Sequence, residues 1–330
     1  MVAGTAYAPS YAAVVSFGSG VNQFNMEFVT IGNAGNAADT DANAKPLSAG
    51  AVGYTYDIGK FEVSRDMITK YNANYGTANN LAITLYDMES DGIVGGNGAN
   101  RPATGISWNE AARFVNWLNT STGNPAAYKF TTTGVNDNID LWDSGDPGYD
   151  VNNKYRNSLA KYFLPSYNEW YKAAYFKPDS PTSTSGTYYD FANGSDTAPT
   201  AVDSGTADNT AVYDGQSGPA DVNSAGGLSP YGVMGLGGNV YEWEESSGGL
   251  ANSSGSFTRG VRGGRWISGS DSLSSSSRIN VNPSFEFNIL GFRVASRSSS
   301  APPAVPEPSM MVIGTLFGVG GLMAKRRMKK

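Results

Sequence analysis

Three glutamates within four positions, Glu242, Glu244 and Glu245, form the densest group of side chains in this 330-residue sequence that could carry out chemistry. Neighbouring carboxylates can act as acid and base when burial or a nearby charge moves their pKa values apart. Any catalysis here would have to use Asp, Glu, Lys, Tyr, Ser or a bound cofactor, because the chain has no Cys and no His. The rest of the sequence offers no set of residues that completes a catalytic site around these glutamates.

The missing residue types exclude several classes of function. Without Cys or His there are no thiolate nucleophiles, disulfides, imidazole bases, imidazole metal ligands or Ser-His-Asp triads. The glycine-rich stretch 235–239 lacks the Lys-Ser/Thr ending of a phosphate-binding loop. Outside residues 301–330 the chain carries 18 basic and 28 acidic residues, a net charge of −10. We therefore expect no nucleic-acid partner, since phosphates require a basic surface.

An acidic loop begins like a calcium-binding EF-hand. Asp87, Glu89 and Asp91 alternate and are followed by Gly92, but the position of the closing acid is Gly98. An EF-hand needs a bidentate carboxylate at that position. We interpret this segment as a solvated acidic loop.

Helix-start signals occur at Ser64, Ser107 and Ser166. The second and third are capping boxes, in which Ser107 and Ser166 are each followed three residues later by a glutamate. Strands are expected at 26–29 and 54–63, and strand-like pieces alternate with turns over 260–297. The loop-rich stretch from 177 to about 231 must be disordered or held by tertiary contacts or ions. Residues 1–25 are interpreted as a flexible leader without a clear export signal.

The last segment, 298–330, differs from the body. A Ser- and Pro-rich linker leads to an apolar run at 310–324 and a basic end at 325–330. The run is shorter than the ~17–25 residues of an ordinary spanning helix. Preceded by Val305, Pro306, Glu307 and Pro308, it resembles the bacterial PEP-CTERM sorting signal. That resemblance implies transient membrane anchoring, an exosortase-type membrane protease as a partner, and export to the cell surface or extracellular matrix.

Six blocks in the body, spread over residues 26–297, resemble the formylglycine-generating enzyme, or sulfatase-modifying factor, family. They are 58–64 (IGKFEVS), 105–111 (GISWNEA), 163–170 (FLPSYNEW), 237–243 (GGNVYEW), 262–266 (RGGRW) and 290–295 (LGFRVA). The resemblance implies an α+β domain with a C-type-lectin-like fold, few helices and much irregular structure. We expect Trp108, Trp170, Trp243 and Trp266 to be core residues and Arg293 to form a structural ion pair.

The family's copper site does not carry over to this sequence. The enzyme holds copper with two cysteines, and by position those sites fall at Ser268 and Leu273, so no copper is expected. A second branch of the superfamily uses iron and histidine, which this chain lacks. The resemblance also implies calcium bound by the carbonyls of Gly238 and Val240 and the carboxylate of Glu242. Gly235 stands where an acid or amide is usual, and the alternative is that Glu242 is a hydrogen-bonded structural acid.

Three functions are compatible with these observations. The first is a non-catalytic binding or structural protein of the cell surface or matrix, with residues 268–282 on the face where the family binds its substrate. Its ligand could be a glycan, a peptide or another matrix protein. The second is an enzyme of the same superfamily with unrecognised chemistry that uses neither Cys nor His. The third is a spacer module of a larger assembly.

Overall fold

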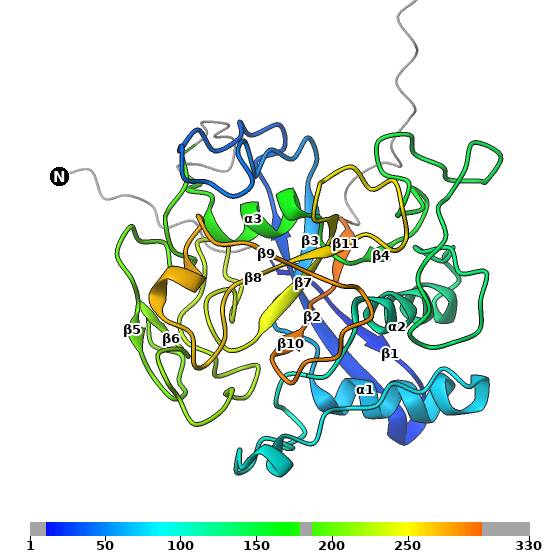
Figure 1. The fold of residues 1–330 in the computed structure, drawn as a ribbon, viewed down its shortest axis with the longest axis horizontal. Coiled ribbons are helices and arrows are strands. Elements are labelled where there is room, and N and C mark those ends of the chain that lie inside the picture. Colours follow the sequence, from blue (N-terminus) through cyan, green and yellow to red (C-terminus); the bar gives the residue numbers. More distant parts are fainter. Residues whose placement is uncertain (1–10, 179–186, 299–330) are drawn as a thin grey trace, which may run out of the picture.

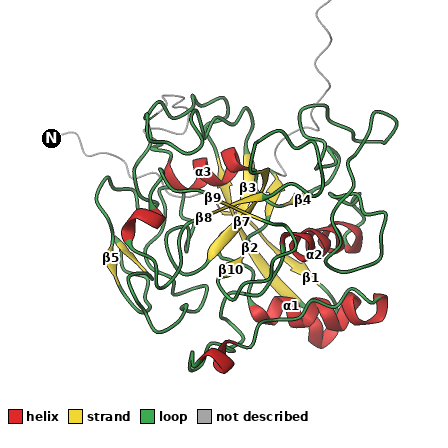
Figure 2. Cartoon of the chain, viewed as in Figure 1, coloured by secondary structure: helices red, strands yellow, loops and turns green. Residues whose placement is uncertain are grey.

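The computed structural model describes residues 11–178 and 187–298. Two small β-sheets cross near the centre, three α-helices lie around them, and loops make up most of the remaining chain (Figures 1 and 2). This arrangement confirms the predicted α+β class with few helices and much irregular structure. Within the described ranges, no helix combines the length and the apolar character needed to cross a bilayer. The apolar run 310–324 and the motif from Val305 to Pro308 lie outside the described residues.

The first sheet has the strand order β1-β2-β3-β11-β4, and every neighbouring pair in it is antiparallel. Its strands are β1 (Tyr11–Phe17), β2 (Phe24–Ile31), β3 (Tyr56–Gly59), β11 (Ala295–Arg297) and β4 (Tyr162–Phe163). Strand β11, the last strand of the domain, lies between β3 and β4. The end of the domain is therefore paired with strands from earlier in the chain.

The second sheet has the order β10-β7-β8-β9. Its strands are β10 (Leu290–Gly291), β7 (Tyr241–Ser247), β8 (Arg259–Arg262) and β9 (Ile279–Val281). A separate parallel pair consists of β5 (Thr200–Ala201) and β6 (Thr210–Ala211). Strand β7 lies inside the second sheet, and its residues from Glu242 to Ser247 are all buried.

The three helices begin where their capping residues predict. They are α1 (Arg65–Tyr71), α2 (Trp108–Ser121) and α3 (Tyr167–Tyr175), with N-caps at Ser64, Ser107 and Ser166. Both capping boxes are complete, because each serine accepts from the amide three residues on and each glutamate bonds back to the serine amide. Short single-turn helices occupy Gly20–Asn22, Asn72–Gly76, Thr77–Asn79, Met88–Asp91 and Ser270–Leu273.

A continuous aromatic-rich core joins the helices to the sheets. Phe114 of α2 lies against Phe24 of β2 and against Phe292, with ring centroids 6.3 and 5.6 Å apart. The four tryptophans expected in the core, Trp108, Trp170, Trp243 and Trp266, are all buried. Tertiary contacts also hold the long loop after α3, because Val212 and Ala220 pack against Val240 and Trp266 in a second cluster.

The interpretation of residues 1–25 as a flexible leader is wrong for residues 11–25. Strand β1 pairs with β2 from Tyr11 to Phe17, and Phe17 is buried against Phe24 and Tyr162. The sequence signal is weak because β1 is an edge strand with two alanines and an exposed valine in its middle. Phe17, a buried ring at the end of the strand, supplies packing.

We predict that Phe17→Ala lowers the free energy of unfolding by about 3 kcal/mol, the usual cost of removing a buried aromatic ring. Val14→Ala on the same strand is the matched control, because Val14 is 63% exposed and its loss should cost less than about 0.5 kcal/mol. Urea denaturation of both variants measures the difference. Equal stabilities would show that β1 contributes nothing to the fold.

Candidate functional site

Leu273, which the family resemblance places at one of the two copper-binding cysteine positions, is a core residue in this protein. It ends the single-turn helix Ser270–Leu273 and is 1% exposed. Its side chain packs with Ala211 and Tyr213 in a small apolar cluster, and its carbonyl accepts a hydrogen bond from the Tyr175 hydroxyl at 3.0 Å. The side chain therefore fills the position with hydrocarbon, which cannot bind a metal ion.

Ser268, at the other position, closes a turn. Its Oγ accepts a hydrogen bond from the backbone amide of Arg265 at 3.2 Å. Its carbonyl accepts one from the amide of Asp214 at 2.8 Å. Both interactions hold the segment after β8 in place, and neither brings a second metal-binding group toward Leu273.

Beside Leu273 lies a cavity of only about 10 Å³. Its walls include Ala192, Leu236 and Gly237, and its polar lining includes Asn193, whose amide donates to Asn209 while its buried Oδ1 has no protein partner. A space of this size holds about one water molecule. The cavity beside Leu273 is therefore too small for a peptide substrate. Among the described residues, no group of three or more acidic side chains is arranged to hold a metal ion.

The three glutamates of β7 are fully buried and bound to arginines. The bonds are Arg293 Nε to Glu242 Oε2 (2.6 Å), Arg262 Nε to Glu244 Oε1 (2.5 Å), Arg278 Nε to Glu244 Oε2 (2.7 Å) and Arg156 Nε to Glu245 Oε2 (2.7 Å). A buried carboxylate remains charged when such a partner offsets the loss of water. These contacts give the glutamates a structural role in holding the sheet to the surrounding loops. The structural ion pair expected for Arg293 is confirmed.

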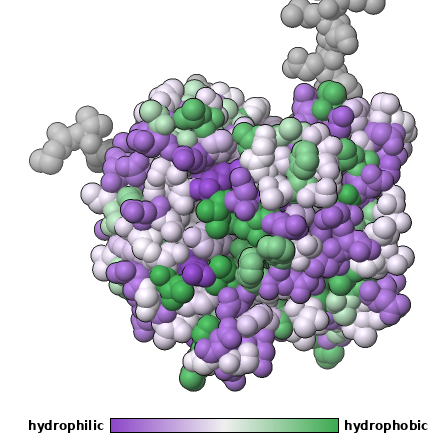
Figure 3. All heavy atoms as spheres, viewed as in Figure 1, coloured by the Kyte–Doolittle hydropathy of each residue, from purple (hydrophilic) through white to green (hydrophobic). Residues whose placement is uncertain are grey.

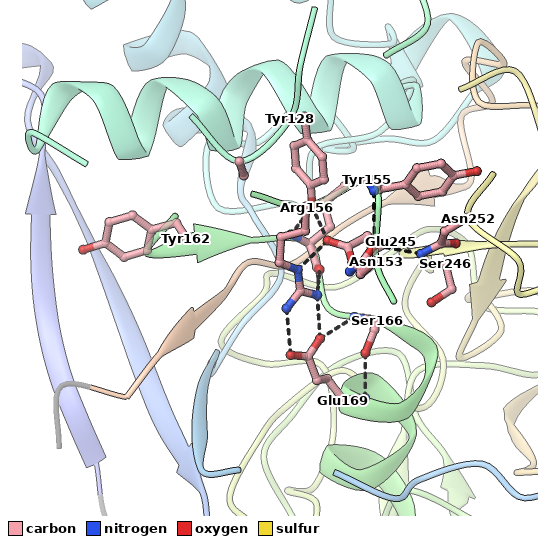
Figure 4. A network of polar contacts seen from close by, with 12 residues as sticks. Tyr128, Asn153, Tyr155, Arg156, Tyr162, Ser166, Glu169, Glu245, Ser246 and Asn252 are labelled. Carbon is pink, nitrogen blue, oxygen red and sulfur yellow. Dashed lines mark hydrogen bonds and ion pairs between the residues drawn. The ribbon is translucent and has the colours of Figure 1, made fainter. Parts of the chain in front are cut away.

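Arg156 joins two parts of the fold through one guanidinium (Figure 4). Besides Glu245, it binds both carboxylate oxygens of Glu169 at 3.0 and 2.8 Å, and it lies 3.7 Å from the centre of the Phe163 ring. Burial opposes the charged form of Glu169, but Arg156 and the capping hydrogen bonds together hold the pKa of Glu169 below its usual range. The Tyr128 hydroxyl completes the network by donating to Glu245 Oε2 at 2.9 Å. The start of α3 is thereby tied to β7.

Calcium does not fit the site that the family resemblance implies. Both oxygens of Glu242 accept hydrogen bonds from Arg293, and Oε2 also accepts one from Trp170 Nε1 at 2.7 Å. The guanidinium already supplies the positive charge that a cation would bring. The position of the usual extra ligand, Gly235, has no room for a side chain, because a Cβ there would lie 2.7 Å from Glu62 Oε1.

Glu62 is a buried acid that the sequence did not single out. Asn239 Nδ2 donates to Glu62 Oε1 at 2.8 Å, whereas Oε2 is buried without a partner. Burial raises the pKa of Glu62 to about 8, against the opposing effect of Arg293 and with help from Glu242. Glu62 is therefore protonated at neutral pH. The sequence pattern of its block, 58–64, predicts a strand that leads into a helix. That pattern does not indicate which other acidic side chain lies near Glu62 in the folded protein.

Two exposed phenylalanines stand on a rigid loop between β9 and β10. Phe285 and Phe287 are 47% and 46% exposed, and their rings contact each other edge to face at 5.3 Å. The loop is held to the N-terminal end of α2, since the Phe287 carbonyl accepts from Gly105 N at 3.0 Å and the Pro283 carbonyl from Asn109 N at 3.3 Å. Figure 3 shows a hydrophobic area near the middle of the face that is viewed there. Fixed, exposed aromatic rings of this kind are typical of binding surfaces.

The two crossing sheets, the three capped helices and the long loops define a C-type-lectin-like α+β domain. Residues 18–298 match the sulfatase-modifying factor enzyme 1-like domain of the FGE-sulfatase family, and the chain belongs to that family. The cysteine-based catalysis of the formylglycine-generating enzyme is absent, because the chain has no cysteine. No curated protein is similar enough in sequence to count as a match.

Three solved structures show the same fold at low sequence identity. Variable protein 1 of Treponema denticola is 21% identical with a TM-score of 0.56, over 86% of this chain and 99% of that one. CarF is 19% identical with a TM-score of 0.53, over 82% and 98%. PvdO from Pseudomonas aeruginosa is 18% identical with a TM-score of 0.50, over 88% and 100%. This chain therefore spans nearly the whole length of each of these proteins.

We predict that Glu242→Gln destabilises the protein by about 3 kcal/mol, because it leaves the buried charge of Arg293 without a counter-ion. The loss should be the same in chelator and in millimolar calcium, and the wild-type melting temperature should not depend on calcium. Thermal melts of both proteins in both buffers provide the test. A calcium-dependent rise in the melting temperature that Glu242→Gln abolishes would place the ion at this carboxylate after all.

We predict that Glu62 makes the protein less stable as the pH rises. Between about pH 4.5, the ordinary value for glutamate, and pH 8 the folded state binds more protons than the unfolded state, so the free energy of unfolding falls. The side chain introduced by Glu62→Gln does not titrate. The free energy of unfolding of this variant minus that of wild type should therefore increase by a few kcal/mol across this pH window and then level off. Burial also moves the pKa values of Glu110 and Lys172 to about 7, but both proteins share these groups. Urea denaturation from pH 5 to 9 measures the difference, and parallel curves would contradict the prediction.

Proposed function

We propose that this protein is a non-catalytic recognition protein that works outside the cell. The observation that carries the proposal is Leu273, whose buried side chain fills the position that the resemblance assigns to a copper-binding cysteine, in a chain that keeps the family fold. A family scaffold without cysteine for the family's catalysis favours a role in which the surface of the protein binds a ligand. A glycan, a peptide or another matrix protein could serve as that ligand.

The rigid loop that carries Phe285 and Phe287 supports a binding role. Backbone hydrogen bonds to Gly105 and Asn109 already fix its conformation, so a ligand would not have to order it. Exposed phenylalanines lose contact with water on binding and can anchor a partner. Ile279 of β9, 43% exposed, is a further apolar side chain in the segment leading to this loop.

The export route rests on the C-terminal segment. Val305, Pro306, Glu307 and Pro308, the apolar run 310–324 and the basic end 325–330 have the order of a PEP-CTERM signal. We propose that an exosortase-type protease recognises this segment and releases the body to the cell surface or extracellular matrix. Anchoring in the membrane would then be transient.

The proposed function predicts binding to matrix and no cysteine oxidation. Full-length protein should co-sediment with extracellular matrix from its source organism, and the double variant Phe285→Ala, Phe287→Ala should bind at least about tenfold more weakly, since two anchors are lost. Phe257→Ala is the control, because Phe257 is equally exposed at 47% but lies outside this loop. A cysteine peptide incubated with the protein, copper and oxygen should remain unmodified by mass spectrometry. Wild-type protein that does not bind matrix would favour a spacer role, and enzymatic turnover would refute the proposal.

We predict that protein isolated from its native host has lost the residues after about Pro308. Cleavage near the Pro-Glu-Pro motif would remove both the apolar run and the basic end. Intact-mass measurement of the mature protein identifies the new C-terminus. Protein ending at Lys330 would rule out the sorting route while leaving the binding role open.

A further inference from the structure

A groove of about 330 Å³ lies along the C-terminal half of α2, whereas the cavity beside Leu273 has a volume of only about 10 Å³. The groove's volume is within the range of small-molecule binding sites, about 300–1,000 Å³. Five aromatic residues from four separate segments line it: Tyr75, Trp117, Tyr128, Phe130 and Trp142. None of these five residues lies in the six sequence blocks that resemble the family.

The rings of the groove are held in fixed positions. Trp142 is the one tryptophan of the six that is not buried, and its Nε1 donates to the carbonyl of Ala127 at 3.0 Å. Phe130 has the guanidinium of Arg113 over its ring at 3.8 Å. Trp117 packs against Tyr71 and Phe114 in the core. Arg113 thus covers one face of Phe130, and Lys129 Nζ lies 5.9 Å from the centre of the Trp142 ring. A ligand entering the groove would meet the remaining ring faces, which need no reordering.

The charged side chains in the groove are already engaged. Lys129 Nζ binds Asp146 at 2.7 Å and Asp143 at 3.2 Å. Arg113 donates to the backbone carbonyls of Thr132, Gly134 and Val135. Neither cation is free to pair with an acidic ligand, so the groove suits an uncharged one.

Backbone groups on one wall of the groove are already paired. The side chain of Asn116 occupies both backbone groups of Tyr128, accepting from its amide at 2.9 Å and donating to its carbonyl at 2.8 Å. A peptide that adds to a sheet edge needs such groups unpaired. Thr120 is exposed at the rim, and its hydroxyl, which donates to the Asn116 carbonyl at 3.1 Å, can still accept a hydrogen bond.

We propose that this groove binds a pyranose ring of a neutral glycan. A pyranose has an apolar face of C–H groups that can lie on an aromatic ring, and hydroxyls at its edge that can bond to a rim residue such as Thr120. Trp142 is the principal stacking residue, because it is the most accessible indole and its orientation is fixed. The site is separate from the loop that carries Phe285 and Phe287.

Fluorescence and calorimetry on the full-length chain test the proposal. The probes are neutral hexasaccharides of glucose, mannose and N-acetylglucosamine, with hexagalacturonate as the acidic counterpart and a tryptophan-containing hexapeptide as the peptide control. At least one neutral hexasaccharide should give a saturable change in tryptophan emission and measurable heat. Trp142→Ala should weaken binding at least about tenfold, while Trp142→Phe, which keeps a ring, should weaken it less.

Two further variants separate binding from folding. Thr120→Arg places a bulky side chain at an exposed rim position and should block the saccharide without changing the melting temperature. Phe257→Ala, away from the groove, should bind as wild type does. The proposal is overturned if no neutral hexasaccharide binds at millimolar concentration, if the hexagalacturonate or the peptide binds more tightly, or if neither Trp142→Ala nor Thr120→Arg weakens binding. Matrix sedimentation depends on Phe285 and Phe287, so failure of one proposal would not be mistaken for failure of the other.

Discussion

The pairing of three buried carboxylates on β7 with four arginines is the constraint on which the rest of this structure depends. Arg262 comes from β8, whereas Arg156, Arg278 and Arg293 come from segments outside the regular elements. A buried charge without a partner costs free energy. Each segment that carries one of these arginines must therefore fold so that the arginine reaches a glutamate of β7. In a chain with few and short elements, these ion pairs specify which loop lies against which side of the sheet. Hydrophobic burial then fills the space between them.

This arrangement suits a chain that keeps the family fold but has no cysteine for the family's cysteine-based catalysis. Leu273 packs with Ala211 and Tyr213 in an apolar cluster beside the main core. A buried leucine side chain adds apolar contact area to that cluster. Tyr175 joins this cluster to the ion pairs of β7, because its hydroxyl donates to the Leu273 carbonyl and also interacts with Arg262.

Local signals in the sequence predicted local structure well. The capping boxes at Ser107 and Ser166 set the starts of α2 and α3, because the hydrogen bonds concerned lie within four residues. Tertiary partners could not be predicted in this way. Nothing near Glu242 in the sequence indicates that Arg293, 51 residues away, would occupy both of its oxygens and exclude calcium. Strand β1 was missed for the same reason, since its stability depends on Phe17 meeting Tyr162 from a distant strand.

Helix α2 links the two aromatic surfaces of the molecule. Its N-terminal end holds the loop of Phe285 and Phe287 through Asn109, while its C-terminal half forms one wall of the groove beside Trp142. Eleven of its fourteen residues are buried, so the helix cannot shift without disturbing the core. Both surfaces are therefore supported by the same rigid element, and a ligand at either one would meet rings that are already in place. In a protein whose loops outweigh its regular structure, the exposed aromatic rings thus stand on loops that are supported by a buried helix.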